Sequence, residues 1–113
     1  MYTVYQHKNK INGKVYIGIT SQKPEQRWGS QGCNYKSSPH FYSAIQKYGW
    51  DNFEHNILFV ELTKEQACLK EQELIKEFNS MNREYGYNST YLFEVKNGNF
   101  NNVYSDFYYK YMN

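Results

Sequence analysis

Cysteine is scarce in this chain. Its 113 residues include only Cys33 and Cys68, which do not stand at the short spacing of a metal-binding motif. Structural zinc sites usually take four cysteine or histidine ligands, so these two residues assemble no zinc centre. A single disulfide between them is the alternative, but two reduced thiols are the usual state in the cytosol. We therefore expect a cytoplasmic protein.

Long apolar runs, internal repeats and low-complexity linkers are also lacking. A membrane-spanning helix needs about 20 consecutive apolar residues, so we expect no membrane partner. Met1 leads directly into a strand pattern, so no signal peptide is expected. A large excess of charge is missing too, and the net charge of +2 neither requires nor excludes nucleic acid as a partner. A chain of this length suits one compact domain.

Aromatic side chains, in contrast, are abundant: 13 tyrosines help to raise their share to 19%. Tyrosine joins an apolar ring to a hydroxyl group, so this excess suits a polar-lined groove or a contact surface. We expect residues 1–90 to form the main domain. Residues 91–113, which hold five of the tyrosines, are expected to be a tyrosine-rich extension of the same compact unit, too short for a second domain.

The beginning of the chain predicts a β-hairpin. Residues 2–7 and 14–19 read as strands, and Asn12-Gly13 between them is a strong signal for a tight turn. Successive side chains of a strand point to opposite faces of the sheet. This period of two decides which residues of the two strands can meet.

With Val4 in the core, Tyr5 and Tyr16 face the other side of the hairpin. Lys14 and Gly18 lie on that side as well. Two phenols, a lysine and a glycine on one face suggest the beginning of a site. A purely structural role stays open, because tyrosine is in any case favoured in strands.

Three helices and a third strand follow the hairpin. Proline at the start of a helix, glycine at its end and a threonine–glutamine capping box are the signals that place them. The predicted elements are helices over 24–30, 39–48 and 64–80 and a strand within 52–62. Together with the hairpin they predict an α+β fold, in which a three-stranded antiparallel sheet is flanked by helices.

The apolar stripe of the last predicted helix contains a carboxylate. The stripe runs through Ala67, Ile75 and Phe78, and Glu71 falls inside it. An ionised carboxylate rarely enters a core face unless it is paired or binds a cation. The other interpretation is a glutamate at the rim of the stripe, or one paired with an arginine.

Short motifs along the chain resemble the GIY-YIG nuclease domain, in the form found in phages and mobile introns. The resemblance covers about residues 1–90. The motifs that carry it are Thr3-Val4-Tyr5, Tyr16-Ile17-Gly18, Arg27-Trp28, His40 with Tyr42, Glu71 and Tyr87-Asn88. Each match alone is weak, but all of them stand in the family's order at plausible separations.

The chain departs from the family's pattern at three places. The first motif reads Thr-Val-Tyr and keeps the phenol. Gln31 stands where many members have a histidine, so either His40 or Tyr35 takes over its task or activity is reduced. The glycine-rich continuation after Asn88 is missing.

The resemblance implies a metal-dependent DNA endonuclease that hydrolyses a phosphodiester with one divalent cation, Mg²⁺ or Mn²⁺. It implies that Glu71 is the protein ligand of the cation and that Arg27 holds the scissile phosphate. Tyr5 is the expected general base for the attacking water, and Tyr16 orients it. His40 shuttles a proton or contacts phosphate. The supporting residues are Lys14, Gly18, Gln31, Tyr35 and Asn88, of which Asn88 fixes the loop beside the site.

Two other functions remain open at this point. The fold could serve as a nucleic-acid-binding module with weak or no catalysis, because Gln31 stands where many family members have a histidine. The tyrosine-rich end could instead make the chain a protein-interaction domain. The expected partner is DNA, the expected state is a monomer or a weak homodimer, and the expected location is the cytoplasm of a bacterial cell or phage-infected host.

Overall fold

A computed structural model describes residues 1–88 of the chain. The predicted extension, 91–113, lies outside the described residues. The elements in chain order are β1 (Tyr2–Asn9), β2 (Val15–Thr20), α1 (Pro24–Trp28), the 3₁₀ segment η1 (Ser30–Tyr35), α2 (Pro39–Tyr48), the 3₁₀ turn η2 (Trp50–Asn52), β3 (Phe53–Leu62) and α3 (Lys64–Phe78). Within residues 1–88, no helix is long and apolar enough to cross a membrane. Both cysteines are free, as expected.

The three strands form one antiparallel sheet in the order β2-β1-β3, so the first strand is the central one. In the hairpin, Tyr5 lies opposite Gly18 and His7 lies opposite Tyr16. Residues directly opposite each other in a ladder share a face of the sheet. Tyr5, His7 and Tyr16 therefore lie on one face, which confirms the predicted orientation of the two tyrosines.

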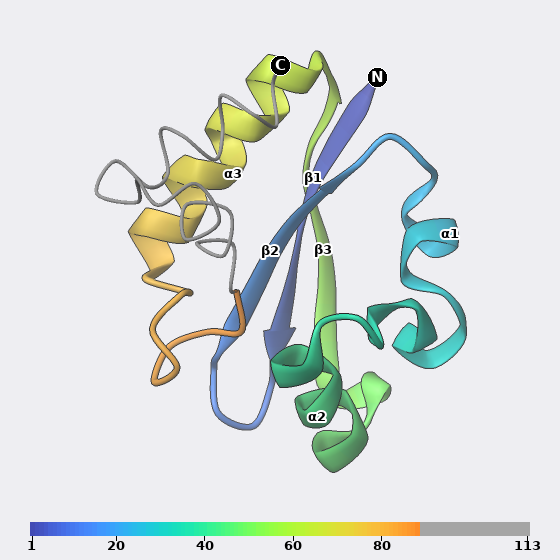
Figure 1. Cartoon of the computed structure of the whole chain (residues 1–113), viewed down its shortest axis with the longest axis vertical. Helices are drawn as coiled ribbons and strands as arrows, with labels where there is room; N and C mark the ends of the chain where they lie inside the picture. Colours follow the sequence, from blue (N-terminus) through green and yellow to red (C-terminus); the bar gives the residue numbers. More distant parts are fainter. Residues whose placement is uncertain (89–113) are drawn as a thin grey trace.

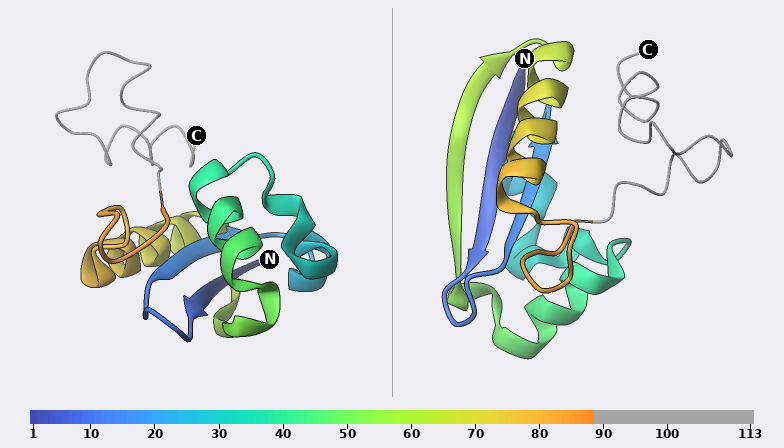
Figure 2. Two further views of the ribbon diagram at one scale, coloured as in Figure 1. Left: turned by 90° about the horizontal axis from the view of Figure 1, so that it is seen from below. Right: turned by 90° about the vertical axis from the view of Figure 1, so that its left-hand side faces the viewer.

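Each face of the sheet has its own core. On the tyrosine face, buried aromatic side chains pack with α2; this aromatic core comprises Tyr5, Tyr35, Phe41, Ala44, Ile45, Phe53 and Tyr87. On the opposite face, Val4 and Ile17 pack against Ala67 and Ile75 of α3. Figure 1 shows α3 on one side of the strands and α1 and α2 on the other. In the right-hand view of Figure 2, β3 is the strand farthest from α3.

The helices begin and end close to where the sequence predicts. Thr63 and Gln66 form the predicted capping box at the start of α3. The helix ends at Phe78 and not at residue 80, because Asn79 adopts the left-handed conformation that terminates a helix. The sequence predicts a polar loop over residues 31–37, but most of that segment belongs to η1 (Ser30–Tyr35). This segment is what carries Tyr35 into the aromatic core.

The described part of the chain ends by joining the outer edge of β2. Tyr87 donates its backbone N–H to the carbonyl oxygen of Val15, and Asn88 bonds both backbone groups of Ile17 through its side chain, at 2.9 and 2.8 Å. The hydroxyl of Ser80 donates to the same amide oxygen of Asn88 at 2.8 Å. An edge strand exposes unpaired backbone groups, and the Asn88 side chain satisfies both backbone groups of Ile17.

Replacing Asn88 with alanine should therefore destabilise the fold. The substitution leaves the buried backbone groups of Ile17 and the hydroxyl of Ser80 without their partner, which should lower the free energy of unfolding by about 2–4 kcal/mol. Urea denaturation followed by circular dichroism measures the change. Asn82→Ala is the matched control in the same segment, because Asn82 is exposed, and it should cost less than about 1 kcal/mol. Equal costs for both variants would contradict the assigned role of Asn88.

Candidate active site

Tyr5 is one of the fully enclosed members of the predicted site. It is 1% exposed, in the middle of the central strand. A Cβ atom built on Gly18 would lie 2.5 Å from the hydroxyl oxygen of Tyr5 and 2.5 Å from its Cζ atom. Gly18 has no positive φ, so its backbone conformation does not require glycine. The position requires glycine because a side chain there would overlap the Tyr5 ring. The tip of the phenol lies in the space that Gly18 leaves on β2.

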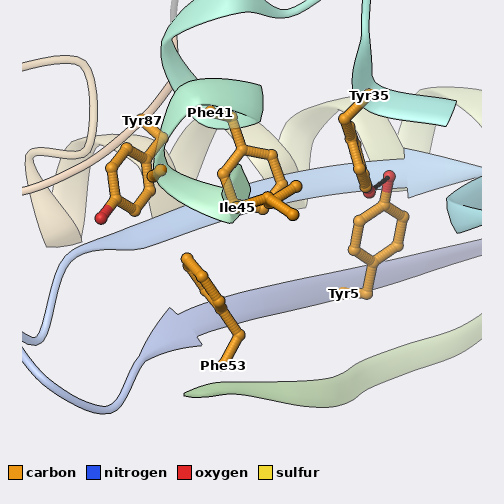
Figure 3. Packing of buried hydrophobic residues seen from close by; sticks show 7 residues of the cluster. Tyr5, Tyr35, Phe41, Ile45, Phe53 and Tyr87 are labelled. Carbon is orange, nitrogen blue, oxygen red and sulfur yellow. Dashed lines mark hydrogen bonds between the residues drawn. The ribbon is translucent and has the colours of Figure 1, made fainter. Parts of the chain in front are cut away.

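A chain of buried hydrogen bonds starts at the Tyr5 hydroxyl and runs across the sheet. Figure 3 shows the hydroxyls of Tyr5 and Tyr35 pointing toward each other. The successive contacts are Tyr5 Oη to Tyr35 Oη at 3.1 Å, Tyr35 Oη to His7 Nε2 at 2.8 Å, His7 Nδ1 to His55 Nδ1 at 2.9 Å, and His55 Nε2 to the carbonyl oxygen of Trp50 at 3.2 Å. The two histidines and Trp50 were not among the residues predicted from the sequence.

The signal for His7 was present in the sequence, because a period of two places it on the same face as Tyr5. Nothing in the sequence indicates the partner on β3, where His55 lies directly opposite His7. The indole of Trp28 covers both histidines, with ring centroids 4.8 Å from His7 and 5.5 Å from His55. Trp50 stacks on His55 at 4.0 Å. These rings separate His7 from solvent.

Arg27 reaches the same group of residues from α1. Its guanidinium lies 4.6 Å from the centre of the Tyr35 ring and donates to the carbonyl oxygen of Asn34 at 3.3 Å. It also hydrogen-bonds the Tyr5 hydroxyl. Burial raises the pKa of Tyr5, while the hydrogen bond with Tyr35 and the Arg27 charge lower it. Arg27 is half-buried, so the guanidinium is held by the aromatic core and still reaches the surface.

Tyr16 lies beside this arrangement and is more exposed than Tyr5. Its ring stacks on Phe41 of α2 with centroids 4.5 Å apart, and its hydroxyl bonds Ser38. Ser38 is the N-cap residue of α2, as the sequence predicts, although its side chain makes no cap hydrogen bond. Burial raises the pKa of Tyr16, and the charge of Arg27 opposes that effect. Both tyrosines are thus neutral at pH 7.

Glu71 is 4% exposed, as its place in the apolar stripe predicts. The sequence also predicts that the long helix brings Glu71 under the tyrosine face. That prediction is wrong: α3 covers the opposite face, because Ala67 and Ile75 pack there. The charge of Glu71 nevertheless raises the pKa of both Tyr5 and Tyr16, so it acts on the tyrosines through the sheet.

His40 and Lys14 lie apart from the hydrogen-bonded chain. They line a shallow cleft of about 200 Å³ together with Asn12, Ser43, Ala44, Lys47, Tyr48 and Tyr87. Burial, Arg83 and Lys14 lower the pKa of His40, so its ring is neutral at pH 7. Lys14, Arg27 and a bound metal ion are the sources of positive charge that the sequence suggests for Tyr5; of the two side chains, Arg27 is the one whose charge acts on Tyr5 and Tyr16. The cleft instead presents two lysines on the surface.

Of the two residues proposed to replace the histidine at position 31, the structure brings only Tyr35 to Tyr5. His40 packs edge-on against Tyr87, with ring centroids 5.2 Å apart. Gln31 itself is exposed and adopts a left-handed conformation, with φ 55° and ψ 29°. A side chain in that conformation is uncommon, and Gln31 stands at a kink inside η1.

In the described part of the chain, Glu71 is the carboxylate whose charge acts on both Tyr5 and Tyr16. Within residues 1–88, no group of three or more histidine, cysteine, aspartate or glutamate side chains could hold a metal ion. A cation at Glu71 would thus take most of its ligands from water and from substrate. Mg²⁺ is commonly bound in this way, by one or two carboxylates plus phosphate oxygens and waters, so the donor set fits such an ion.

Comparison with known proteins gives a consistent result. The sequence pattern of the GIY-YIG catalytic domain matches residues 1–86. The putative endonuclease segD of Enterobacteria phage T4 is 34% identical over 91 residues, which cover 75% of this chain and 38% of that protein. The putative endonuclease segE of the same phage is 40% identical over 72 residues, covering 64% and 33%. The chain thus spans only 38% and 33% of these two curated relatives.

A solved structure is similar as well. A mutant of the catalytic domain of intron endonuclease I-TevI matches with a TM-score of 0.64 and 32% sequence identity. The match covers 78% of this chain and 93% of that one. It confirms the predicted fold class, a three-stranded antiparallel sheet flanked by helices.

Adding a methyl group at position 18 should displace Tyr5. The new Cβ of Gly18→Ala would overlap the phenol, and such overpacking should lower the free energy of unfolding by about 1–3 kcal/mol. Chemical denaturation measures this cost. In a Tyr5→Leu background the shorter side chain leaves the space open, so the same Gly18→Ala change should then cost almost nothing. The assignment fails if the cost is the same in both backgrounds.

Proposed function

Since the chain belongs to the GIY-YIG catalytic domain family, we propose that it is a metal-dependent endonuclease that hydrolyses a phosphodiester bond of DNA with one divalent cation. The observation that carries this proposal is the convergence of four side chains from four elements. Arg27 hydrogen-bonds Tyr5, and the charges of Arg27 and Glu71 both act on Tyr5 and Tyr16. A surface that served only to pack the sheet would have no need of a buried carboxylate and a guanidinium there.

Arg27 holds the scissile phosphate in this proposal. Negative charge grows on the phosphoryl oxygens as the bond to the attacking water forms, and a fixed cation stabilises that charge. The planar fork of a guanidinium matches two phosphate oxygens at once. The contacts of Arg27 with the Tyr35 ring and the Asn34 carbonyl oxygen fix its orientation before the substrate arrives.

Glu71 is the residue that would hold the divalent cation. When bound, such a cation supplies positive charge to the phosphate and to the departing 3′ oxygen. Burial of the Glu71 carboxylate next to two phenols supports this assignment, because a cation there would offset the cost of keeping the carboxylate ionised.

Tyr5 is the proposed general base for the attacking water, and Tyr16 orients that water. The pKa of Tyr5 is raised by burial, so a phenolate is not its resting state. Its hydroxyl must therefore give up its own proton as it takes one from water. The hydrogen bond to Tyr35 offers the first place for that proton to go.

The cleft that holds Lys14 and His40 suits contact with the DNA backbone beside the scissile phosphate. Lys14 and Lys47 line it together with the neutral His40 ring. Lysines that face a shallow groove bind phosphates through charge, without reading sequence. A protein that binds DNA here without cutting it is the second candidate, because Gln31, in place of the family's common histidine, can act neither as a base nor as an acid.

Removing the Glu71 carboxylate should abolish cation-dependent cleavage. Glu71→Gln keeps the size of the side chain and removes its charge, so nicking of supercoiled plasmid with Mg²⁺ should fall by at least about 100-fold. Addition of EDTA should stop plasmid cleavage by the unmodified protein. Glu73→Gln is the matched control on the same helix, because Glu73 is exposed and pairs only with Lys70 at 3.2 Å. Full activity of Glu71→Gln would refute the metal assignment. DNA binding without cleavage by the unmodified protein would favour the second candidate.

The shape of Arg27 should matter as well as its charge. Arg27→Lys keeps the positive charge but loses the planar fork and the stacking on Tyr35. Single-turnover cleavage should fall by about 10²–10³-fold, while DNA affinity in a gel-shift assay should stay within about threefold of the unmodified protein. Arg27→Ala should lose both cleavage and some affinity. If Arg27→Lys cuts DNA at the full rate, charge alone explains the role of this residue.

A further inference from the structure

The buried hydrogen bonds beyond Tyr5 have a single direction, set at their far end. The carbonyl oxygen of Trp50 can only accept, so Nε2 of His55 donates to it and carries the proton. In a neutral His55 ring, Nδ1 then lacks a proton and accepts from Nδ1 of His7. The Nε2 atom of His7 is left to accept from the Tyr35 hydroxyl. The Tyr35 and Tyr5 oxygens lie 3.1 Å apart, and a hydroxyl has only one proton to donate. With its proton given to His7, Tyr35 therefore accepts from Tyr5 in this arrangement. Every donor along the chain therefore points away from Tyr5.

This direction requires both histidines to be neutral, and their surroundings keep them so. Burial, together with His55 and Arg27, holds the pKa of His7 well below its usual value. Burial lowers the pKa of His55 too, but its hydrogen bond to the Trp50 carbonyl oxygen and the nearby carboxylate of Asp51 oppose that effect. His55 is also half-exposed, whereas His7 is fully buried. Of the two rings, His55 is the one equipped to hold a proton and exchange it with solvent.

We propose that Tyr35, His7 and His55 form a proton relay that carries to solvent the proton which Tyr5 takes from the attacking water. This inference rests on the proposed endonuclease function. It gives His7 and His55 a part in the reaction that neither the motifs nor the family match assigns. His40, which was predicted to shuttle a proton, lies outside the relay.

The transfers balance in one sequence of proton movements. As the water oxygen bonds to phosphorus, the water loses one proton to the Tyr5 oxygen. The bond to the 3′ oxygen breaks with its electron pair left on that oxygen, which takes up a proton from solvent. The hydroxyl proton of Tyr5 passes to Tyr35, and that of Tyr35 passes to Nε2 of His7. The Nδ1 proton of His7 passes to Nδ1 of His55, which becomes an imidazolium and then releases one proton to solvent. No phenolate accumulates, which suits a buried phenol with a raised pKa.

The aromatic residues around the relay keep water away from its middle. Trp28 lies over His7 and His55, and Phe41 stacks on His7 with ring centroids 5.5 Å apart. Without these rings, water could take the proton from Tyr5 directly and the histidines would be unnecessary. The relay therefore explains why two histidines are placed in the interior of an aromatic core.

The first test reads the direction of the relay without measuring activity. Two-bond ¹H–¹⁵N NMR spectra of the full chain at neutral pH report which ring nitrogen of each histidine carries the proton. His7 should be protonated on Nδ1, the less common form, and His55 on Nε2. A neutral His7 ring protonated on Nε2 would overturn the relay.

The second test measures cleavage under single-turnover conditions. His55→Gln cannot take up a proton, so the rate should fall by about 10–100-fold with unchanged DNA affinity. His55→Ala should fall by a similar factor and be restored at least in part by free imidazole, because the half-exposed site admits a small base. Tyr35→Phe breaks the relay nearer to Tyr5 and should not respond to imidazole. Glu54→Gln, an exposed neighbour of His55 on β3, should cut at the full rate.

The outcomes separate the relay from the enzyme function. If the unmodified protein cuts DNA and His55→Gln cuts at the same rate, the relay is wrong and the endonuclease proposal stands. If the rate of His55→Ala falls but imidazole has no effect, His55 is structural and the relay is again wrong. If the unmodified protein cuts no DNA with Mg²⁺ or Mn²⁺, the proposed function fails, and the relay fails with it.

Discussion

The close approach of Tyr5 to Gly18 is the contact on which the rest of the site depends. Because position 18 has no side chain, the phenol of the central strand extends over the neighbouring strand, and an added Cβ would lie 2.5 Å from the hydroxyl oxygen. That placement brings the Tyr5 hydroxyl within reach of both Tyr35 and Arg27. It also brings the phenol toward β2, the strand against which the helix of Glu71 packs. A larger residue at 18 would separate these groups.

A polar chain inside an aromatic core is stable only when every donor has an acceptor, because an unpaired buried polar group costs about 1–3 kcal/mol. The run from Tyr5 to the Trp50 carbonyl oxygen meets this condition at each step. Its completeness explains how His7 can be fully buried without a charge. The same set of hydrogen bonds fixes which nitrogen of each histidine ring carries the proton. The pairing that stabilises the buried polar groups therefore also sets the direction of the hydrogen bonds.

The sequence allowed the hairpin, the face shared by its two tyrosines and the order of the helices to be predicted, because each depends on local signals. A period of two placed Tyr5 and Tyr16 on one face, and a capping box marked the start of α3. What sequence reasoning missed depends on contacts between distant segments. Tyr35 enters the core because a predicted loop folds into η1. The face that α3 covers depends on the packing of Ala67 and Ile75, and the pairing of His7 with His55 depends on the register of β3.

Two segments far apart in the sequence pack against β2, the strand that carries Tyr16 and Gly18. Asn88 bonds the backbone of Ile17 at the edge of the sheet, which fixes the position of that strand. The helix α3 packs on the sheet face opposite the tyrosines, so the charge of Glu71 acts on Tyr5 and Tyr16 through the sheet. A charge in a poorly hydrated interior acts more strongly than in water, so this carboxylate influences both phenols without sharing their face.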